Sequence, residues 1–184
     1  MGRWEPDAQG RLQQAALTLY AEQGFDQTTV AEIAERAGLT ERTFFRYFAD
    51  KREVLFGGQG LLLDQLTTSI AAAADSATPL DIVSIALQSV ALIFDDRRDA
   101  SRLRQAVIDT NPALQERELT KLSALAAAMA DGLVGRGVAE TTARLAGESG
   151  AAVFRLAFEQ WLADDKHDLA HFIRSAIADL KASM

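Results

Sequence analysis

Apolar residues recur at intervals of three and four positions along almost the whole chain, and no segment alternates apolar and polar residues for long. This spacing places apolar side chains on one face of an α-helix, whereas alternation is typical of a strand. We therefore expect an all-α protein of about nine helices. The expected ranges are 7–23, 30–37, 41–47, 51–74, 79–94, 99–109, 112–135, 140–163 and 166–182.

Residues that commonly begin and end helices define the expected ends of the first four helices. Gly24 follows the first helix at a position that favours glycine. Thr29 is followed three residues later by Glu32, which is the spacing of a capping box at a helix N-terminus. Thr40 and Asp50 are side chains of the kind that cap the next two helices.

The two short helices between residues 30 and 47 have the pattern of a helix-turn-helix. Gly38 lies between them and gives the permissive backbone that a tight turn requires. Ala34 is small enough for a close helix crossing, and Phe44 and Phe48 are expected in the core. The free face of the second helix then has the geometry with which a recognition helix enters the DNA major groove.

The distribution of charge supports DNA binding by this segment. The chain of 184 residues has 19 Lys+Arg and 26 Asp+Glu, a net charge of −7, which argues against a general nucleic-acid coat or a membrane-surface protein. From Arg36 to Arg52, however, there are five cations and two acids. The residues after Phe56 hold 12 cations and 17 acids, so the surplus acid lies mostly outside the helix-turn-helix.

Residues 9–56 resemble the N-terminal domain of the TetR-type bacterial transcriptional regulators. The resemblance rests on a first helix ending in Gly-Phe, on the motifs Thr-Thr-Val, Ile-Ala and Ala-Gly-Leu-Thr, on an aromatic-rich third helix and on Lys51. It implies a homodimer whose two recognition helices lie in successive major grooves of a palindromic double-stranded DNA operator. It further implies a DNA-binding domain in residues 1–50 and a C-terminal domain in 51–184 that dimerises, binds a small molecule and releases the DNA.

The resemblance also assigns DNA contacts. Thr29 and Thr40 would contact phosphate through hydroxyl groups or helix N-terminal amides. Arg42 would read a base edge, most naturally O6 and N7 of guanine. The expected DNA-binding residues are Thr29, Thr40, Glu41, Arg42, Thr43, Phe45, Arg46, Tyr47 and Lys51.

Phe45 departs from the family pattern, because this position is often tyrosine. A phenol hydroxyl contact is therefore absent, and we expect Phe45 to touch a thymine methyl group or a sugar. Arg46 would compensate with a phosphate contact. Tyr47 matches a position that contacts the DNA backbone, and Lys51 matches one that binds phosphate.

Apolar residues of the later helices are the expected lining of an effector pocket, because ligand sites between helices are mostly apolar. Plain core packing is the alternative for each of them. Residues 102–129 resemble the effector domains of regulators that respond to acyl-CoA-like or other hydrophobic ligands. The expected lining residues are Phe94, Leu103, Val107, Leu122, Leu125, Met129, Phe154, Phe158 and Trp161.

The last two helices are expected to form the dimer interface as half of a four-helix bundle. Two features favour this. Small residues, namely Ala146, Gly147, Gly150 and Ala151, would allow close packing, and the apolar stripe of 169–180 would otherwise be exposed.

Three glycines, Gly57, Gly58 and Gly60, stand early in the expected fourth helix. Glycine inside a helix costs about 0.5 to 1 kcal/mol relative to alanine. One hypothesis is a hinge through which ligand binding changes the spacing of the recognition helices. A close helix contact or a distorted helix start is the alternative.

Several functions are excluded by what the sequence lacks. With no cysteine and two histidines, it offers no disulfide, no thiol sensor and no nucleophile–base pair, so we expect neither an enzyme nor a cofactor. His167 and His171 have a spacing that could bind a metal, but no third ligand of clear spacing accompanies them, so an exposed helix start is the expectation there. No apolar run approaches the roughly 18 residues of a membrane helix, and no signal peptide is evident, which predicts a cytoplasmic protein without membrane contact. The predicted function is a transcriptional repressor released by a small hydrophobic ligand. The alternative is a DNA-binding regulator without a ligand switch, whose C-terminal half only dimerises.

Overall fold

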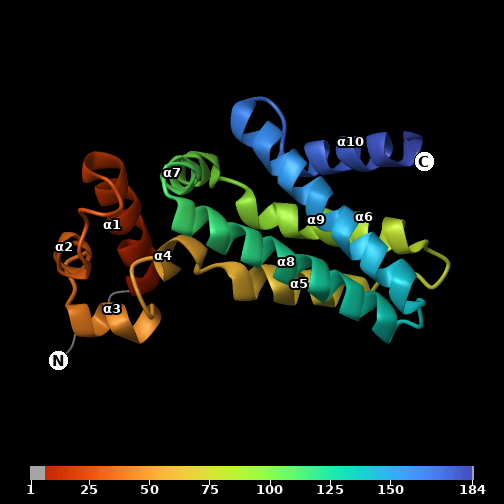
Figure 1. Cartoon of the computed structure of the whole chain (residues 1–184), viewed down its shortest axis with the longest axis horizontal. Coiled ribbons are helices and arrows are strands. Elements are labelled where there is room, and N and C mark those ends of the chain that lie inside the picture. Colours follow the sequence, from red (N-terminus) through yellow and green to blue (C-terminus); the bar gives the residue numbers. More distant parts are fainter. Residues whose placement is uncertain (1–6, 184) are drawn as a thin grey trace. The chain divides into compact units, whose positions relative to one another are not determined.

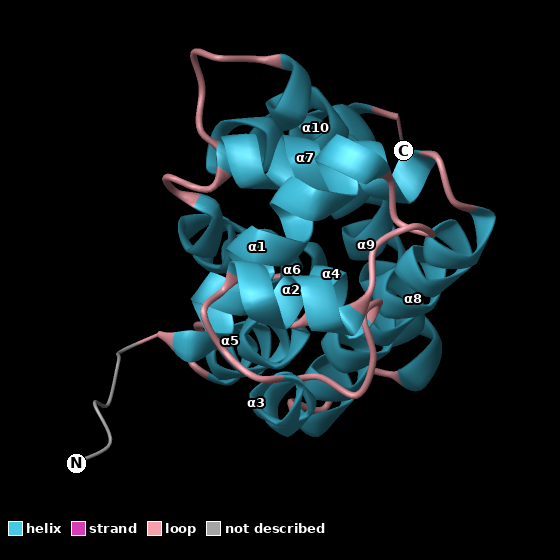
Figure 2. Cartoon of the chain, turned by 90° about the vertical axis from the view of Figure 1, so that its left-hand side faces the viewer, coloured by secondary structure: helices cyan, strands magenta, loops and turns pink. Residues whose placement is uncertain are grey.

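A computed structural model of the protein describes residues 7–183, and these residues form helices and connecting loops (Figures 1 and 2). The all-α prediction is confirmed. The outermost residues of the two expected domains, 1–6 and 184, lie outside the described chain. The elements are α1 (Ala8–Gln23), α2 (Val30–Arg36), α3 (Glu41–Tyr47), α4 (Glu53–Phe56), α5 (Gln59–Ala71), α6 (Pro79–Ala91), the 3-10 helix η1 (Leu92–Phe94), α7 (Arg98–Asp109), α8 (Pro112–Gly135), α9 (Glu140–Ala163) and α10 (Leu169–Ala182).

The predicted caps of α2 and α3 are present. Thr29 Oγ1 accepts a hydrogen bond from the Glu32 amide, and the Glu32 carboxylate accepts one from the Thr29 amide, which completes the capping box. Thr40 Oγ1 accepts from the Thr43 amide at the start of α3. Gly38 has a φ of 66°, in the left-handed region that a side chain would disfavour, so glycine is required in the turn.

The expected helix over 51–74 is wrong in two respects. It starts at Glu53 because Asp50 Oδ1 accepts from the amides of Arg52 and Glu53 and closes a turn before the helix. It is also interrupted at Gly57 and Gly58, so that α4 and α5 are separate helices. The final helix likewise starts later than expected, at Leu169, because the Asp168 side chain caps it.

The described chain divides into two compact units. The first unit comprises the chain up to Gly57 together with Asp99–Glu116. Its core is formed by residues of α1 to α4, including the fully buried Phe44 and Leu12, and confirms the expected burial of Phe44 and Phe48. Residues from far along the sequence complete this core, namely Val107, Ile108 and Leu114 from α7 and the first turn of α8.

The second unit comprises Gly58–Arg98 and the chain from Arg117 onward. Within it, α6 packs against α5, α9 and α10, and buried residues such as Leu87, Met129 and Ile173 form one apolar core. None of the helices in the described chain is long and apolar enough to span a membrane. These units are defined by packing alone, so the expected functional domains of 1–50 and 51–184 remain a prediction.

The small residues of α9 have a different role from the expected one. A Cβ atom on Gly147 would lie 2.4 Å from the carbonyl oxygen of Ala126, and one on Gly150 would lie 2.6 Å from Val83 Cγ1. These glycines therefore allow α9 to approach α8 and α6 of its own chain. The stripe of α10 is similarly covered, because Leu169, Ile173 and Ile177 are buried in the core of the second unit. Neither feature supports a dimer interface.

Candidate functional site

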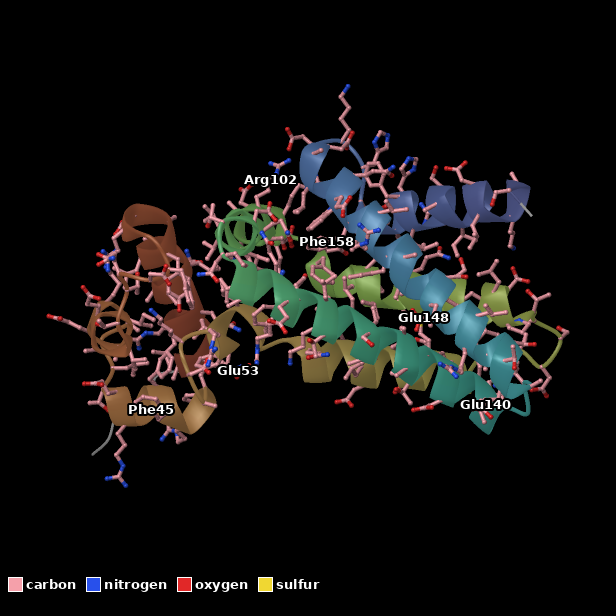
Figure 3. All side chains as sticks on the ribbon, in the orientation of Figure 1. Phe45, Glu53, Arg102, Glu140, Glu148 and Phe158 are labelled. Carbon is pink, nitrogen blue, oxygen red and sulfur yellow. The ribbon has the colours of Figure 1, made fainter. Side chains whose placement is uncertain are left out.

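The short helix α3 has one buried face and one exposed face. Phe44 is fully buried and packs against Phe48, with 5.5 Å between the ring centroids. On the other side, two large aromatic side chains are exposed, Phe45 at 55% and Tyr47 at 40% (Figure 3 labels Phe45). Three charged residues of the same helix, Glu41, Arg42 and Arg46, are exposed as well.

The two arginines of α3 differ in their surroundings. Arg46 Nη2 donates to the Tyr47 hydroxyl at 3.1 Å, and its guanidinium lies 4.9 Å from the Tyr47 ring centroid. The Arg46 and Tyr47 side chains therefore contact each other on the exposed face of α3. Arg42 makes no hydrogen bond or ion pair with any residue that the structure describes. Its guanidinium donors are available to a ligand such as the edge of a base.

Thr29 and Thr40, which are expected to contact phosphate, are the N-caps of α2 and α3 in the structure. Thr40 Oγ1 accepts from the Thr43 amide at 3.2 Å, and the Thr43 hydroxyl lies 3.0 Å away. Thr29 donates its hydroxyl hydrogen to Glu32 Oε2 at 2.8 Å. Hydrogen bonds from the Thr29 amide and hydroxyl lower the pKa of Glu32, so this carboxylate remains charged and keeps the cap closed at neutral pH.

Lys51 has a structural role that the sequence did not indicate. Its Nζ donates to the carbonyl oxygens of Phe25 at 2.9 Å, Asp26 at 3.2 Å and Thr28 at 2.9 Å. It also lies 4.5 Å from the Phe25 ring centroid. An ammonium group has three donors, so all of them are used by the loop before α2. The expected phosphate contact of Lys51 stays a prediction, and it would have to replace one of these bonds.

The Lys51 backbone is held from the opposite side by α1. The Tyr20 hydroxyl donates to the Lys51 carbonyl oxygen at 2.6 Å. Burial raises the pKa of Tyr20 well above its usual value, so the hydroxyl stays protonated and keeps donating at any ordinary pH. Tyr20 and Lys51 together connect α1, the loop before α2 and the turn before α4.

The positive charge of this segment is smaller than the sequence count suggests. Arg36 pairs with Glu22, which is 14 positions earlier in the chain, at 2.7 Å. Arg52 pairs with Asp50 at 2.9 Å. Arg42 and Arg46 are therefore the cations of the 36–52 segment that carry no carboxylate partner and no backbone carbonyl.

Seven of the nine expected effector residues belong to the second unit. They lie in its core or pack against it, and they are Phe94, Leu122, Leu125, Met129, Phe154, Phe158 and Trp161. Four of these form an aromatic cluster in which the ring centroid of Phe94 lies 5.3 Å from Phe158, 6.1 Å from Phe154 and 6.0 Å from Trp161.

The other two expected effector residues are placed differently. Val107 is buried in the core of the first unit, and the Leu103 side chain, also in the first unit, is 39% exposed. Both lie on α7, whose apolar face belongs to the first unit. The sequence did not reveal this, because helical spacing shows which residues share a face but not which core that face joins.

Comparison with known proteins gives two family matches and a relative that covers most of the chain. Residues 12–56 match the family described as bacterial regulatory proteins, tetR family, and residues 77–184 match the MftR C-terminal domain. Over 180 residues the chain is 27% identical to a Mycobacterium tuberculosis protein named as a putative mycofactocin biosynthesis transcriptional regulator, MftR. The match covers 96% of this chain and 90% of the relative.

Two solved structures have a similar fold. One is described as a putative TetR-family transcriptional regulator from Syntrophomonas wolfei, with a TM-score of 0.68 and 15% identity over 96% of this chain and 94% of that chain. The other is Thermus thermophilus FadR, a transcriptional repressor in complex with lauroyl-CoA, with a TM-score of 0.60 and 23% identity over the same shares.

The bonds of Lys51 predict a loss of stability on its removal. Replacing Lys51 with methionine leaves three carbonyl oxygens without their donor, so we expect the free energy of unfolding to fall by about 1 to 3 kcal/mol. Urea denaturation followed by circular dichroism measures this change. The matched control is Arg52→Met, which removes an exposed ion pair worth less than about 1 kcal/mol. Equal unfolding midpoints for Lys51→Met and the unchanged protein would contradict the structural role.

Proposed function

Because the chain belongs to the TetR family of bacterial regulatory proteins, we propose that it is a repressor that binds a palindromic operator as a homodimer and is released by a small hydrophobic ligand. That it is a transcriptional regulator of the TetR type follows from the family. The observation that carries the proposal further is the exposed face of α3, where Arg42 has no partner among the described residues. As a DNA-binding regulator of bacteria, it would act in the cytoplasm.

Arg42 is proposed as the residue that reads sequence. It is the second residue of α3, and the N-terminal residues of a recognition helix are those that meet base edges in the major groove. A guanidinium group can donate two parallel hydrogen bonds to O6 and N7 of guanine. Glu41 and Thr43, on either side of it, are weaker candidates for base contacts.

The remaining residues of α3 are proposed to position the helix on DNA. The exposed ring of Phe45 suits a thymine methyl group or a sugar, since it has no hydroxyl to donate. Arg46 and Tyr47 together present a cation and a hydroxyl to phosphate. The helix starts at Thr29 and Thr40 would add amide contacts to phosphate, because their hydroxyls are already used as caps.

The proposed dimer interface is the exposed face of α9, joined by α10. Leu145 and Leu156 of α9 are 65% and 45% exposed, and the smaller residues Ser149 and Ala152 lie between them on the same face. Exposed small residues of α10, Ser175 and Ala178, suit close helix packing. A second copy of the chain that covers these leucines would complete a four-helix bundle.

The proposed effector contacts are the seven residues of the second unit, centred on the aromatic cluster of Phe94, Phe154, Phe158 and Trp161. The apolar character of these side chains supports a hydrophobic ligand. The similar T. thermophilus FadR was solved with lauroyl-CoA, which supports an acyl-CoA-like ligand for this chain.

The three glycines near α4 and α5 have separate roles in the proposal. A Cβ atom on Gly57 would lie 2.9 Å from Phe48 Cε1, so a close contact explains this glycine. At Gly58 and Gly60 nothing lies within 4 Å of such an atom. Packing does not require these two glycines, and we retain them as the proposed hinge, with Gly58 just before α5 and Gly60 in its first turn.

Arg42 is predicted to determine sequence preference. For Arg42→Ala, the affinity for DNA from the region upstream of the protein's own gene should fall by about 10- to 100-fold, whereas affinity for random DNA should hardly change. Fluorescence anisotropy with duplexes of equal length measures both. The control Arg46→Ala should weaken both duplexes alike and reduce the salt dependence by about one phosphate contact. An equal loss of affinity for both duplexes on Arg42→Ala would contradict the assignment of Arg42 to a base contact.

The exposed leucines of α9 are predicted to be needed for dimerisation. Leu145→Glu with Leu156→Glu places two like charges in the proposed interface, so the dimer dissociation constant should rise by at least about tenfold. Analytical ultracentrifugation measures it. The control is Leu119→Glu, which changes an exposed leucine of α8. If the double variant dimerises as well as the control, the interface lies elsewhere.

A further inference from the structure

Arg98 is a half-buried cation beside the aromatic cluster of the second unit. It is the first residue of α7, and its guanidinium lies 5.0 Å from the ring centroid of Trp161. Its Nη2 donates to the backbone carbonyl oxygen of His167. The sequence pattern did not single out this residue, because it stands in a charged stretch between two helices.

Arg98 has no acidic partner although acids surround it in sequence. Asp95, Asp96 and Asp99 all lie within three positions of it. Asp99 instead pairs with Arg102 at 3.6 Å. Within the described chain, no carboxylate contacts Arg98, and its Nε is buried without a hydrogen-bond acceptor.

A buried donor on a charged group without an acceptor is unfavourable, and such groups are usually paired in stable structures. The His167 carbonyl and the Trp161 ring compensate only part of this cost. An unsatisfied donor of this kind is therefore suited to an acceptor that arrives from outside the chain. That acceptor must carry oxygen atoms and, to match a guanidinium, a negative charge.

The neighbouring side chains define the other part of such a ligand. Phe94 is four positions before Arg98 in sequence. The ring centroid of Phe94 lies 5.3 Å from that of Phe158 and 6.0 Å from that of Trp161 (Figure 3 labels Phe158). Phe94 and Phe158 are half-buried, so their rings are partly accessible. The site combines one cation with a set of apolar rings.

We infer that Arg98 binds the anionic group of an amphiphilic effector, a carboxylate or a phosphate, while the apolar part of that effector contacts Phe94, Phe158 and Trp161. This inference rests on the proposed effector site and adds the charge that its ligand carries. Because Nε is shielded from solvent in the present structure, binding has to move some of the side chains around it.

Arg98 is the first residue of α7, a helix whose later turns belong to the first unit. Further along the same helix, Arg104 Nε donates to the carbonyl oxygen of Leu55 at 2.6 Å, and Val107 and Ile108 are buried in the core of the first unit. A ligand that draws Arg98 away from His167 therefore acts on the start of a helix whose later turns belong to that core.

Trp161 provides a local probe of binding. The chain has two tryptophans, so the variant Trp4→Phe leaves Trp161 as the single indole. Titrating this protein with dodecanoate, lauroyl-CoA and the neutral dodecanol, below micelle-forming concentrations, measures their affinities by fluorescence. Dodecanoate and lauroyl-CoA distinguish a carboxylate from a phosphate-bearing ligand. We expect at least one of them to bind more tightly than dodecanol.

Substitution of Arg98 tests the role of its charge. In the Trp4→Phe background, Arg98→Gln should weaken the preferred anionic probe by about 10- to 100-fold and leave dodecanol unchanged. Arg98→Lys, which keeps the positive charge but not the Nε donor, should give an intermediate affinity. The matched control is Arg97→Gln, because Arg97 is exposed and adjacent in sequence. Thermal melting of each variant confirms that it is folded.

Different outcomes would overturn different statements. If the anionic probes bind Arg98→Gln as tightly as the parent, or if Arg97→Gln loses as much affinity, Arg98 is not the anion site. If dodecanol binds near Trp161 and releases DNA while the anionic probes have no advantage, the effector site stands and the inference fails. If no probe, charged or neutral, changes Trp161 fluorescence or DNA binding, the proposed site at this cluster is itself wrong.

Discussion

The burial of Phe44 is the constraint on which the proposed DNA recognition depends. The helix α3 has seven residues, and a helix of that length is not stable alone in water. It is held by the fully buried Phe44, by its contact with Phe48 and by the Thr40 cap. Phe44 directs one face inward, so the opposite face must carry Arg42, Phe45 and Arg46 at the surface.

The same physical reasoning separates residues that stabilise the first unit from those whose side chains remain available to a ligand such as DNA. Thr29, Thr40 and Lys51 use their side-chain groups within the chain, on caps or on carbonyl oxygens. Arg42 uses none of its donors among the described residues. With a net charge of −7, the chain has little general attraction for DNA, so recognition should depend on these few groups.

Local features of the fold were predictable from the sequence, whereas features that join distant segments were not. The Thr29 capping box and the Gly38 turn depend on residues within a few positions, and both were confirmed. The pairing of Arg36 with Glu22 and the packing of Gly147 on Ala126 depend on tertiary contacts. For that reason the sequence count overestimated the positive charge of the 36–52 segment. For the same reason the small residues of α9 were expected in a dimer interface.

The candidate site shows the same division. Exposure of the α3 residues followed from helical spacing once Phe44 was assigned to the core. Val107 was expected among the effector residues, whereas the structure places it in the core of the first unit, because spacing does not show which of two cores a helix joins. Arg98 was missed because its significance lies in the absence of an acidic partner, which only the three-dimensional arrangement of Asp95, Asp96 and Asp99 reveals.

The most direct test of sequence-specific recognition by α3 is selection of binding sites from a pool of random DNA duplexes by the full-length protein. A dimer that reads DNA through two copies of α3 should enrich an inverted repeat whose half-sites are centred about one helical turn, ~34 Å, apart. A pool that shows no enriched sequence, or an enriched sequence without two-fold symmetry, would contradict operator binding by a homodimer.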